Sequence, residues 1–539
     1  MNDFDALIIG GGHNGLVCAH RLARGGRRVA VLERLPVLGG ACVTGEIAPG
    51  YRASTASYVV SLLLPEIEQD MALARHGYRV LPRSPSSFTP FEDGRSLLMG
   101  PEPGLSMREI ARFSARDAEA YPRYEALLTR VAERLEPALM QTPPELLPLP
   151  ASWRRRGWRA WLRNLGRGHS LYRAFKDLAE DLPEAVELLT GAATPILDRW
   201  FESPELKGTL ATDAIIGSFA PPSAPGSAYV LLHHVMGMAG GARGVWGYVE
   251  GGMGALTQAM ASACREAGVT LYTGAEVVAI EVEGGRAAGV RLADGRHLRA
   301  RQIASNATAE ITFRRLLGES ALPAGFRAAV ARIDYASASL KINLAVDRLP
   351  CFRARPHEGT APAPHHHGTI HLNSLSEQIE RAYEEARQGR PSRQPVIEMV
   401  IPSSVDRTLA PDGHHIVQLF VQYAPYRLAP GLDWEALREP YADQVIAEVE
   451  RYAPGFAASV LHREVLSPLD LERRFALTGG NIFQGAMPLH QLFAFRPVPG
   501  WGDYATPLPG LFLCGAAAHP GGGVMGACGL NAAREMLRG

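Results

Sequence analysis

The chain has 539 residues, of which 46% are hydrophobic and 20% are charged. This length exceeds what one hydrophobic core normally supports, so we expect at least two domains. The composition excludes a disordered chain, a collagen-like chain and a small disulfide-rich protein. Lys plus Arg and Asp plus Glu both number 55, so no excess of positive charge attracts nucleic acid.

The cysteines and the N-terminus bear on the cellular compartment. The six cysteines occur singly, without C-x-x-C spacing, which is typical of reduced, buried thiols. Asp3 and Asp5 stand where a signal peptide would carry basic residues. No apolar run reaches the roughly 18 residues that a membrane-spanning helix needs. We therefore expect a cytoplasmic protein, either soluble or peripheral to the inner face of a membrane.

Residues 4–32 have the pattern of a strand, a glycine-rich turn, a helix and a second strand. Residues 4–9 are almost entirely apolar, as in a buried parallel strand, and residues 16–24 continue as a helix. Residues 28–32 form the second expected strand. This order within about thirty residues predicts a dinucleotide-binding Rossmann unit.

The turn and the end of the second strand carry the residues that such a unit needs. Gly10, Gly12 and Gly15 have G-x-G-x-x-G spacing, and Glu33 follows the second strand. In this motif the first glycine makes the tight turn, the second lets the backbone approach a pyrophosphate, and the third lets the helix pack on the strand. Glu33 is placed to accept a hydrogen bond from a ribose hydroxyl.

The loop after Glu33 favours FAD over other dinucleotides. It runs through Arg34 to Gly40 and Ala41, and an acid followed by a Gly-Gly loop is the pattern of glutathione-reductase-like folds. Cys42 stands where the disulfide reductases of that group carry a redox cysteine, but their second cysteine is replaced here by Ile47. We expect Arg34, Gly40 and Ala41 at the cofactor and no disulfide chemistry.

A second run of glycines lies near the C-terminus. Gly521, Gly523 and Gly526 stand between an expected strand at residues 510–515 and a helix at residues 525–537. Too few residues follow for a second strand and acid, so this is not a second nucleotide site. We expect the helix N-terminus to point at the far end of the same FAD. Without a nicotinamide site, electrons pass to oxygen, a quinone or another soluble acceptor.

These motifs resemble those of the phytoene-desaturase-related FAD flavoproteins, in the amine-oxidase and phytoene-desaturase superfamily. Within it the chain is similar to the branch of pyridine nucleotide-disulfide oxidoreductase domain-containing proteins. The resemblance implies an α/β fold with a glutathione-reductase-like FAD-binding Rossmann domain and a discontinuous α+β substrate domain. Many relatives have Gly-Asp where this chain has Gly515-Ala516, which weakens one cofactor contact. The segments that carry the resemblance are 10–17, 229–237, 251–254, 341–343, 479–483 and 515–527.

The resemblance adds cofactor-binding candidates and suggests domain boundaries. It suggests that Val278 offers backbone contacts to adenine. The remaining candidates for cofactor binding are His13, Asn14, Gly515, Gly523, Val524 and Met525. We assign residues 1–100, 245–310 and 501–539 to the FAD domain, and residues 101–244 and 311–500 to the substrate domain, with 101–235 mostly helical.

Proteins of this kind move a hydride from substrate carbon to flavin N5 and create a double bond. The leading hypothesis is therefore desaturation or dehydrogenation of an apolar, lipid- or isoprenoid-like substrate. One alternative is an amine oxidase, in which Lys341 would hold a water at N5; a structural ion pair is the favoured interpretation of Lys341. Another is a flavoprotein with a structural or interaction role. His519 precedes the last helix and is either a proton carrier or a turn-stabilising residue.

Two further segments have competing interpretations. His365, His366, His367 and His371 could bind a metal, but the flanking prolines favour a solvated surface loop and no metal site. Residues 153–167 form an amphipathic pattern, with Trp158, Trp161, Leu162 and Leu165 on one face and arginines elsewhere. This pattern predicts either a membrane-facing helix or a lid over the substrate tunnel. A homo-oligomer is compatible with the sequence.

Overall fold

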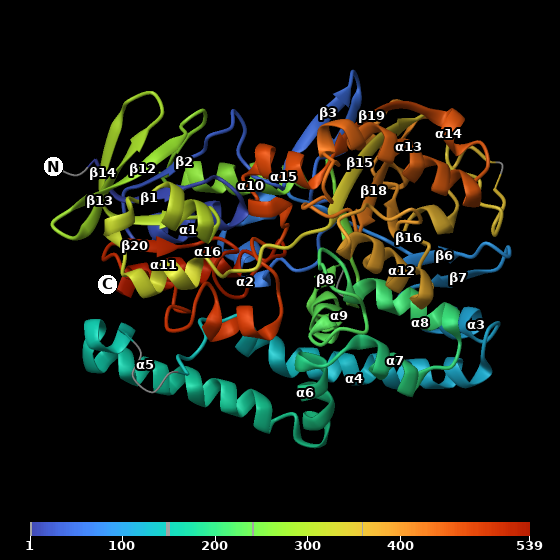
Figure 1. The fold of residues 1–539 in the computed structure, drawn as a ribbon, viewed down its shortest axis with the longest axis horizontal. Helices are drawn as coiled ribbons and strands as arrows, with labels where there is room; N and C mark the ends of the chain where they lie inside the picture. Colours follow the sequence, from blue (N-terminus) through green and yellow to red (C-terminus); the bar gives the residue numbers. More distant parts are fainter. Residues whose placement is uncertain (1–2, 147–150, 240–241, 358, 539) are drawn as a thin grey trace.

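The computed structural model describes residues 3–146, 151–239, 242–357 and 359–538. Figure 1 shows two β-sheets side by side, with a layer of helices running along the lower edge of both. Five of the six cysteines are buried and all six are free, as expected for reduced thiols. Among the described residues, no helix combines the length and the apolar character needed to cross a bilayer.

The first sheet contains the Rossmann unit expected at the N-terminus. Five strands lie parallel in the order β11-β2-β1-β14-β20, and β12 and β13 add an antiparallel extension to β14. β1 is buried on both faces over its last four residues, because helices cover the sheet on each side. The strands are β1 (Phe4–Ile9), β2 (Val29–Leu32), β11 (Thr270–Tyr272), β12 (Val277–Glu283), β13 (Arg286–Leu292), β14 (His297–Ser305) and β20 (Leu511–Leu513).

Helices from both ends of the chain pack together on this sheet. An added Cβ at Gly529 would lie 2.0 Å from the backbone oxygen of Asn14, so the two terminal helices approach closely at this glycine. The helices that pack around the first sheet are α1 (His13–Arg24), α2 (Pro65–Asp70), α10 (Met253–Glu266), α11 (Ala324–Val330) and α16 (Ala527–Arg538).

The second sheet has seven strands in the order β19-β15-β18-β17-β16-β6-β7. All pairs are antiparallel except β16 with β6. Its strands are β6 (Ser87–Pro90), β7 (Ser96–Met99), β15 (Ser339–Val346), β16 (Thr369–Leu372), β17 (Ile397–Val400), β18 (His415–Gln422) and β19 (Val460–Leu466). α13 (Trp434–Tyr452) and α14 (Phe456–Ser459) share its apolar core. α12 (Ser376–Arg387) packs against the helical segment, and α15 (Pro468–Phe475) lies between the two sheets.

The segment expected to be mostly helical forms the third layer. It contains α3 (Pro103–Ile110), α4 (Ala115–Leu139), α5 (Ala151–Lys176), α6 (Leu182–Thr190), α7 (Ala193–Trp200), α8 (Pro204–Ala211) and α9 (Ser227–Met236). Three short ladders complete the fold: β3 (Thr44–Ala48) with β4 (Tyr51–Ser54), β5 (Val80–Pro82) with β10 (Gly247–Val249), and β8 (Met238–Ala239) with β9 (Ala242–Arg243).

The structure differs from the sequence-based expectation in three places. Residues 87–99 were grouped with the FAD segments but form β6 and β7 of the second sheet, because β6 pairs with β16. Residues 311–330, expected in the substrate domain, pack into the core of the first sheet through Phe313 and Phe326. The histidine-rich segment is not a solvated loop: His365 and His366 are buried against Phe352.

The contact between α1 and α16 makes a stability prediction. We expect Gly529→Ala to lower the free energy of unfolding by about 1–3 kcal/mol, because the new methyl group overlaps the Asn14 carbonyl. Gly166→Ala in α5 is the matched control, since an added Cβ there has no atom within 4 Å. Alanine should leave the control unchanged or raise its stability by up to about 1 kcal/mol. Urea unfolding of both variants measures this, and equal midpoints would contradict the prediction.

Candidate cofactor and substrate site

A cavity of about 1550 Å³ lies between the two sheets and the helical layer. Its walls come from the glycine loop of β1 and α1, from β15–β18 of the second sheet, and from α4 and α9. Small-ligand pockets usually have volumes of roughly 300–1,000 Å³. This cavity is therefore large enough for a dinucleotide together with a substrate.

The glycine loop lies at one end of the cavity, and its glycines have the steric roles that the motif predicts. Gly10 has φ +94°, in the left-handed region. A Cβ on Gly15 would lie 2.2 Å from the Gly10 carbonyl oxygen, so α1 could not pack against the strand end with any larger residue. A Cβ on Gly40 would lie 3.3 Å from the Cα of Gly12, because the second glycine pair lies directly beside the first loop.

Glu33 closes this end of the cavity. It is 5% exposed and lines the cavity wall. One carboxylate oxygen accepts a hydrogen bond from the backbone N–H of Gly11 at 2.8 Å, and the other accepts from Leu35 N–H at 2.9 Å. These bonds hold the carboxylate beside the glycine loop, in the position where the Rossmann motif places its ribose acceptor.

Residues from the middle and the end of the chain also line the cavity near the glycine loop. Gly523 and Val524, directly before α16, line the cavity, and Gly523 has φ +113°. Val278 lies at a register shift between Val277 and Ala279, where β12 departs from regular pairing with β13. Such a bulge leaves a residue outside the ladder. These three positions and the glycine loop together fit an extended dinucleotide such as FAD.

Arg34 connects this end of the cavity to α15. Its guanidinium donates hydrogen bonds to the carbonyl oxygens of Arg473, at 3.1 Å, and of Arg474. These carbonyls belong to the last turn of α15, where unpaired oxygens and the helix dipole favour a cation. The C-terminus of α15 is thereby held against the cavity, which Arg473 and Phe475 line.

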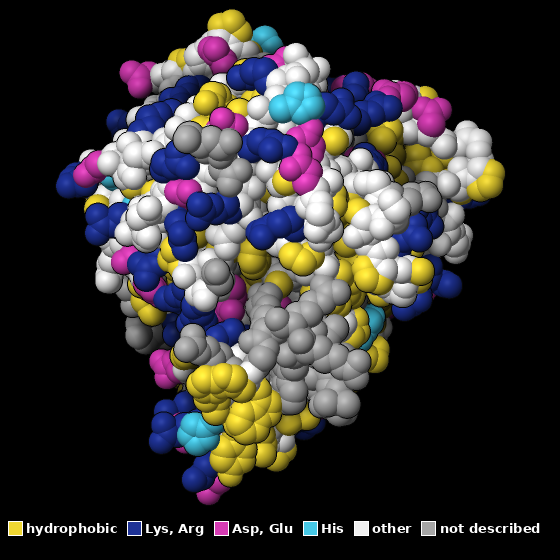
Figure 2. All heavy atoms as spheres, turned by 90° about the vertical axis from the view of Figure 1, so that its left-hand side faces the viewer, with side chains coloured by type: hydrophobic (Ala, Val, Ile, Leu, Met, Phe, Trp, Pro, Cys, Tyr) yellow, Lys and Arg dark blue, Asp and Glu magenta, His cyan; other side chains and the backbone are white. Residues whose placement is uncertain are grey.

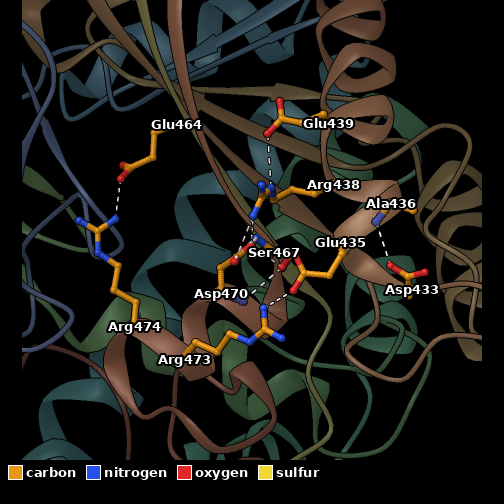
Figure 3. Close-up of polar contacts among 10 residues, drawn as sticks. All are labelled: Asp433, Glu435, Ala436, Arg438, Glu439, Glu464, Ser467, Asp470, Arg473 and Arg474. Carbon is orange, nitrogen blue, oxygen red and sulfur yellow. Dashed lines mark hydrogen bonds and ion pairs between the residues drawn. The ribbon is translucent and has the colours of Figure 1, made fainter.

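Figure 3 shows how α15 is tied to its surroundings. At its start, Ser467 and Asp470 form a reciprocal capping box, and Arg438 of α13 lies 3.3 Å from Asp470. Arg473 pairs with Glu435 of α13, and Arg474 lies 2.5 Å from Glu464 of β19. Exposed ion pairs contribute only about 0–1 kcal/mol each, so these contacts orient α15 rather than stabilise the fold.

Most of the residues predicted from the sequence lie at this cavity. The predicted residues that line it are Gly10, Gly12, His13, Asn14, Glu33, Arg34, Gly40, Ala41, Val278, Lys341, Gly523 and Val524. Gly15, Gly515, Met525 and His519 do not line it. Gly15 and Gly515 permit close backbone packing instead: a Cβ on Gly515 would lie 2.5 Å from Asn306. Met525 is buried, and its carbonyl accepts a hydrogen bond from Leu64 N–H.

His519 is placed as a structural residue. Its Nδ1 accepts a hydrogen bond from the backbone N–H of Phe493 at 3.1 Å, and its Nε2 contacts the Leu139 carbonyl at 2.5 Å. Burial lowers the pKa of His519 to about 3, so the ring is neutral. With both nitrogens engaged by backbone groups, His519 connects the C-terminal loop to α4, and this favours the turn-stabilising interpretation.

Cys42 has the environment of a packed thiol. Its Sγ lies 3.8 Å from Nδ1 of His13, and burial raises its pKa to about 12. A thiolate is the reactive form of cysteine, so this environment suppresses nucleophilic and redox chemistry. Within the described part of the chain, no group of three or more His, Cys, Asp or Glu side chains is placed to hold a metal ion.

The second sheet presents a polar row at the other end of the cavity. His371, Glu398, Phe420 and Lys341 are successive cross-strand partners on β16, β17, β18 and β15. All four line the cavity, so they lie on one face of the sheet. We call this set the polar row. Nδ1 of His371, Oε1 of Glu398 and Nζ of Lys341 are buried and make no hydrogen bond to another described residue.

Lys341 has an unusual environment for a lysine. It is 1% exposed, and its Nζ lies 3.9 Å from the ring centroid of Tyr58. Burial lowers its pKa well below the usual range, which favours the neutral amine. Burial also raises the pKa of Glu398 to about 8, and its second carboxylate oxygen accepts from the Tyr58 hydroxyl at 3.0 Å. An unpaired buried polar atom costs about 1–3 kcal/mol, which indicates selection for a ligand rather than for stability.

Sequence reasoning did not place several residues that line the cavity near the polar row. Arg83, Asp213, His371 and Glu398 all line it. The available signal was a single polar residue inside an otherwise apolar strand: Glu398 stands among Ile397, Met399 and Val400 in β17. β15 carries Lys341 together with the polar residues Ser339 and Asn343, and Lys341 was predicted as the only lysine outside the helical region. Arg83 and Asp213 lie outside regular strands and carry no comparable pattern.

The model of the family described as "Flavin containing amine oxidoreductase" matches residues 15–537. The chain belongs to this family. The expected superfamily, the Rossmann-type FAD-binding fold and FAD as the cofactor are confirmed, and the protein is an FAD-dependent oxidoreductase.

Two relatives and one solved structure illustrate the range of the likeness. The chain is 47% identical to pyridine nucleotide-disulfide oxidoreductase domain-containing protein 2 of Rattus norvegicus, over 99% of this chain and 94% of the relative. It is 26% identical to a neurosporene-forming phytoene desaturase of Cereibacter sphaeroides, over 97% and 92%. An oxidoreductase of Methanosarcina mazei shares the fold, with a TM-score of 0.61, 17% identity and coverage of 99% and 100%.

The position of Glu33 leads to a prediction for cofactor binding. We expect Glu33→Ala to weaken FAD binding by about 10- to 150-fold, because a hydrogen bond to a charged group contributes roughly 1.5–3 kcal/mol. Titration of the apoprotein with FAD, followed by flavin fluorescence, measures the Kd. Glu68→Ala, at an exposed position of α2, is the control. An unchanged Kd in Glu33→Ala would remove Glu33 from the cofactor site.

Proposed function

We propose that this protein is an FAD-dependent dehydrogenase or desaturase of an apolar, lipid- or isoprenoid-like substrate. The observation that carries the proposal is the continuity of one cavity from the glycine loop to a chamber with mostly apolar walls. Tyr121, Tyr124 and Leu128 of α4 and Leu231 of α9 line that chamber. The likeness to a phytoene desaturase supports the same substrate class.

In this reaction the residues of the chain bind the cofactor, exclude water and orient the substrate. Bound FAD supplies the hydride acceptor, and oxygen or a quinone then takes the electrons. Gly10, Gly12 and Glu33 hold the nucleotide end of the cofactor. The aromatic and aliphatic walls exclude water and orient an apolar chain, which binds because its surface leaves water.

Lys341 favours one second candidate, an amine oxidase. Its Nζ lines the cavity without a hydrogen-bonding partner among the described residues, so it could hold a water molecule beside bound FAD. The contact of its Nζ with the face of the Tyr58 ring is the competing structural use of the same group. The two functions differ in which substrates reduce the flavin and in what Lys341 does.

Anaerobic reduction distinguishes the two candidates. We expect squalene or phytoene in detergent to bleach the visible flavin absorbance of the FAD-loaded protein, and benzylamine to leave it unchanged. Bleaching by the amine alone would replace the proposal with an amine oxidase. Failure of both to bleach the flavin would favour a structural flavoprotein.

Lys341→Met tests whether Lys341 takes part in the reoxidation of the reduced flavin by oxygen. After photoreduction of the flavin, admission of oxygen should reoxidise this variant at a rate close to that of the wild type. Proton-transfer groups contribute about 100-fold or more to the steps that they catalyse. A 100-fold slower reoxidation with unchanged FAD content would therefore favour the oxidase.

We also propose that α5 contacts an anionic membrane surface, from which an apolar substrate reaches the cavity. Trp158, Trp161, Leu162 and Leu165 are 67%, 42%, 49% and 50% exposed. In Figure 2, which looks at the left-hand side of Figure 1, hydrophobic side chains gather at the lower end of the face, over α5. The helix contains no Asp or Glu, and such a basic, Trp-bearing helix is typical of interfacial binding. The side chains of residues 151–157 and 159 lie outside the described residues.

Vesicle sedimentation tests this contact. We expect the wild type to sediment with phosphatidylglycerol vesicles. The double variant Trp161→Glu with Leu165→Glu should reduce the bound fraction at least about tenfold, because neither new carboxylate inserts at the boundary between the lipid headgroups and the acyl chains. Leu461→Glu, an exposed position on β19, should bind as the wild type does. If the double variant also binds unchanged, α5 acts as a lid or plain surface helix.

A further inference from the structure

Arg83 is a buried cation without a direct counter-charge. It follows β5, lines the cavity and is 3% exposed. Its Nε donates to the Trp246 carbonyl at 2.9 Å, and its Nη1 donates to the Thr369 hydroxyl at 2.8 Å. Neither acceptor is charged, and no ion pair of Arg83 occurs among the described residues. Buried charges are normally paired, so this arrangement indicates that an anion completes the site.

The guanidinium of Arg83 has N–H groups that are free to donate hydrogen bonds to such an anion. A guanidinium has five N–H groups in a rigid fork, and the two hydrogen bonds described above use two of them. Thr369 and Trp246 hold the group from the second sheet and from the segment before β10, so its orientation is fixed in advance. Its Cζ also lies 5.2 Å from the centroid of the Tyr248 ring. A preorganised fork of this kind matches the two oxygens of a carboxylate.

Burial opposes ionisation of the acids around Arg83, and neither forms an ion pair with it among the described residues. Burial raises the pKa of Glu398 to about 8, with a further contribution from the charge of Asp213. Burial likewise raises the pKa of Asp213, an effect that the charges of His234 and Arg83 oppose. His371 faces the same space, and burial lowers its pKa to about 3, which leaves the ring neutral. The N–H groups of Arg83 that remain unused therefore have no direct ionic partner among the described residues.

The surroundings of Arg83 define what the anion is attached to. Trp246, Met99 and Phe420 line the cavity near it, and Met99 pairs with Ser87 where β6 meets β16 and Thr369. A small hydrated anion would lose its water against these apolar groups. A carboxylate at the end of an apolar chain satisfies both the guanidinium and the walls.

We propose that Arg83 binds the carboxylate of an apolar substrate, so that long-chain carboxylic acids bind in this cavity more tightly than neutral chains of the same length. The proposal rests on the proposed function, because it assumes that the apolar substrate occupies this cavity. Glu398 and His371 flank the carboxylate as neutral hydrogen-bonding groups. An ammonium group at the same place would face the unpaired charge of Arg83, and the anion is favoured for that reason.

Calorimetric titration of the FAD-loaded protein at neutral pH tests the choice of head group without any turnover. Octanoate, octanamide and octylamine are suitable probes, since they share one chain length and differ only at the end. We expect octanoate to bind about 10- to 100-fold more tightly than octanamide, as expected for a charge-assisted bidentate pair. Octylamine should bind more weakly than either.

Variants at Arg83 assign the preference to this residue. Arg83→Gln should remove the preference for octanoate and leave octanamide binding unchanged, while Arg83→Lys should retain part of it. Arg79→Gln is the matched control, because Arg79 lies on the same segment, is exposed and pairs with Glu250. Thermal unfolding and FAD content of each variant report its folding. If Arg83→Gln fails to fold, Arg83→Lys and the three probes on the wild type still decide the question.

Each outcome separates this inference from the proposed function. Equal binding of octanoate and octanamide, a preference that survives in Arg83→Gln, or no binding of any probe would overturn the inference. Tighter binding of octylamine would show instead that Asp213 and Glu398 recognise a cation. A preference for octanoate that depends on Arg83, in a protein whose flavin no apolar compound reduces, would support the carboxylate site and contradict the proposed function.

Discussion

The close approach of α1 and α16 is the constraint on which the cofactor site depends. Gly529 lets α16 lie against the backbone of Asn14, and Gly15 lets α1 lie against the end of β1. These two contacts bring residues 521–526 beside the glycine loop, although about 500 positions separate them in the chain. The amide of Asn531 extends the arrangement by donating to the Met140 carbonyl and the Tyr504 hydroxyl, which ties α16 to the helical layer.

The second sheet contains buried polar groups that lower its stability. β15 and β18 are buried along their whole length, and alternate side chains of each strand form an apolar core. The polar row lies on the opposite face of the sheet, the face that lines the cavity. Burial of Lys341, Glu398 and His371 without full hydrogen bonding opposes folding, and such groups persist where a ligand supplies the missing contacts. We propose that the row marks the substrate end of the cavity, with the cofactor at the glycine loop.

The predictions from sequence succeeded where the signal was local. The strand at residues 4–9 and the strands around residues 277–282, 339–346 and 416–423 appear as β1, β12, β15 and β18, because their apolar patterns reflect burial within one element. The histidine-rich segment misled the sequence analysis for the complementary reason. Its prolines and histidines resemble a solvated loop, but Phe88 and Phe352 pack against His365 and exclude solvent. Burial of such a segment depends on distant residues.

The order of strand, glycines, helix and acid in residues 4–33 was sufficient to indicate a dinucleotide-binding unit, because each of those residues acts within a single supersecondary motif. The Gly-Gly loop after Glu33 then favoured FAD. The same information could not place His519, whose ring is engaged by backbone groups of Phe493 and Leu139. Nor could it bring Arg83, Asp213, Glu398 and Lys341 to one chamber, because strand register and the parallel pairing of β6 with β16 determine which side chains share a face. Local physics defines the motif that holds the cofactor, whereas the packing of remote segments defines the chemistry of the substrate end.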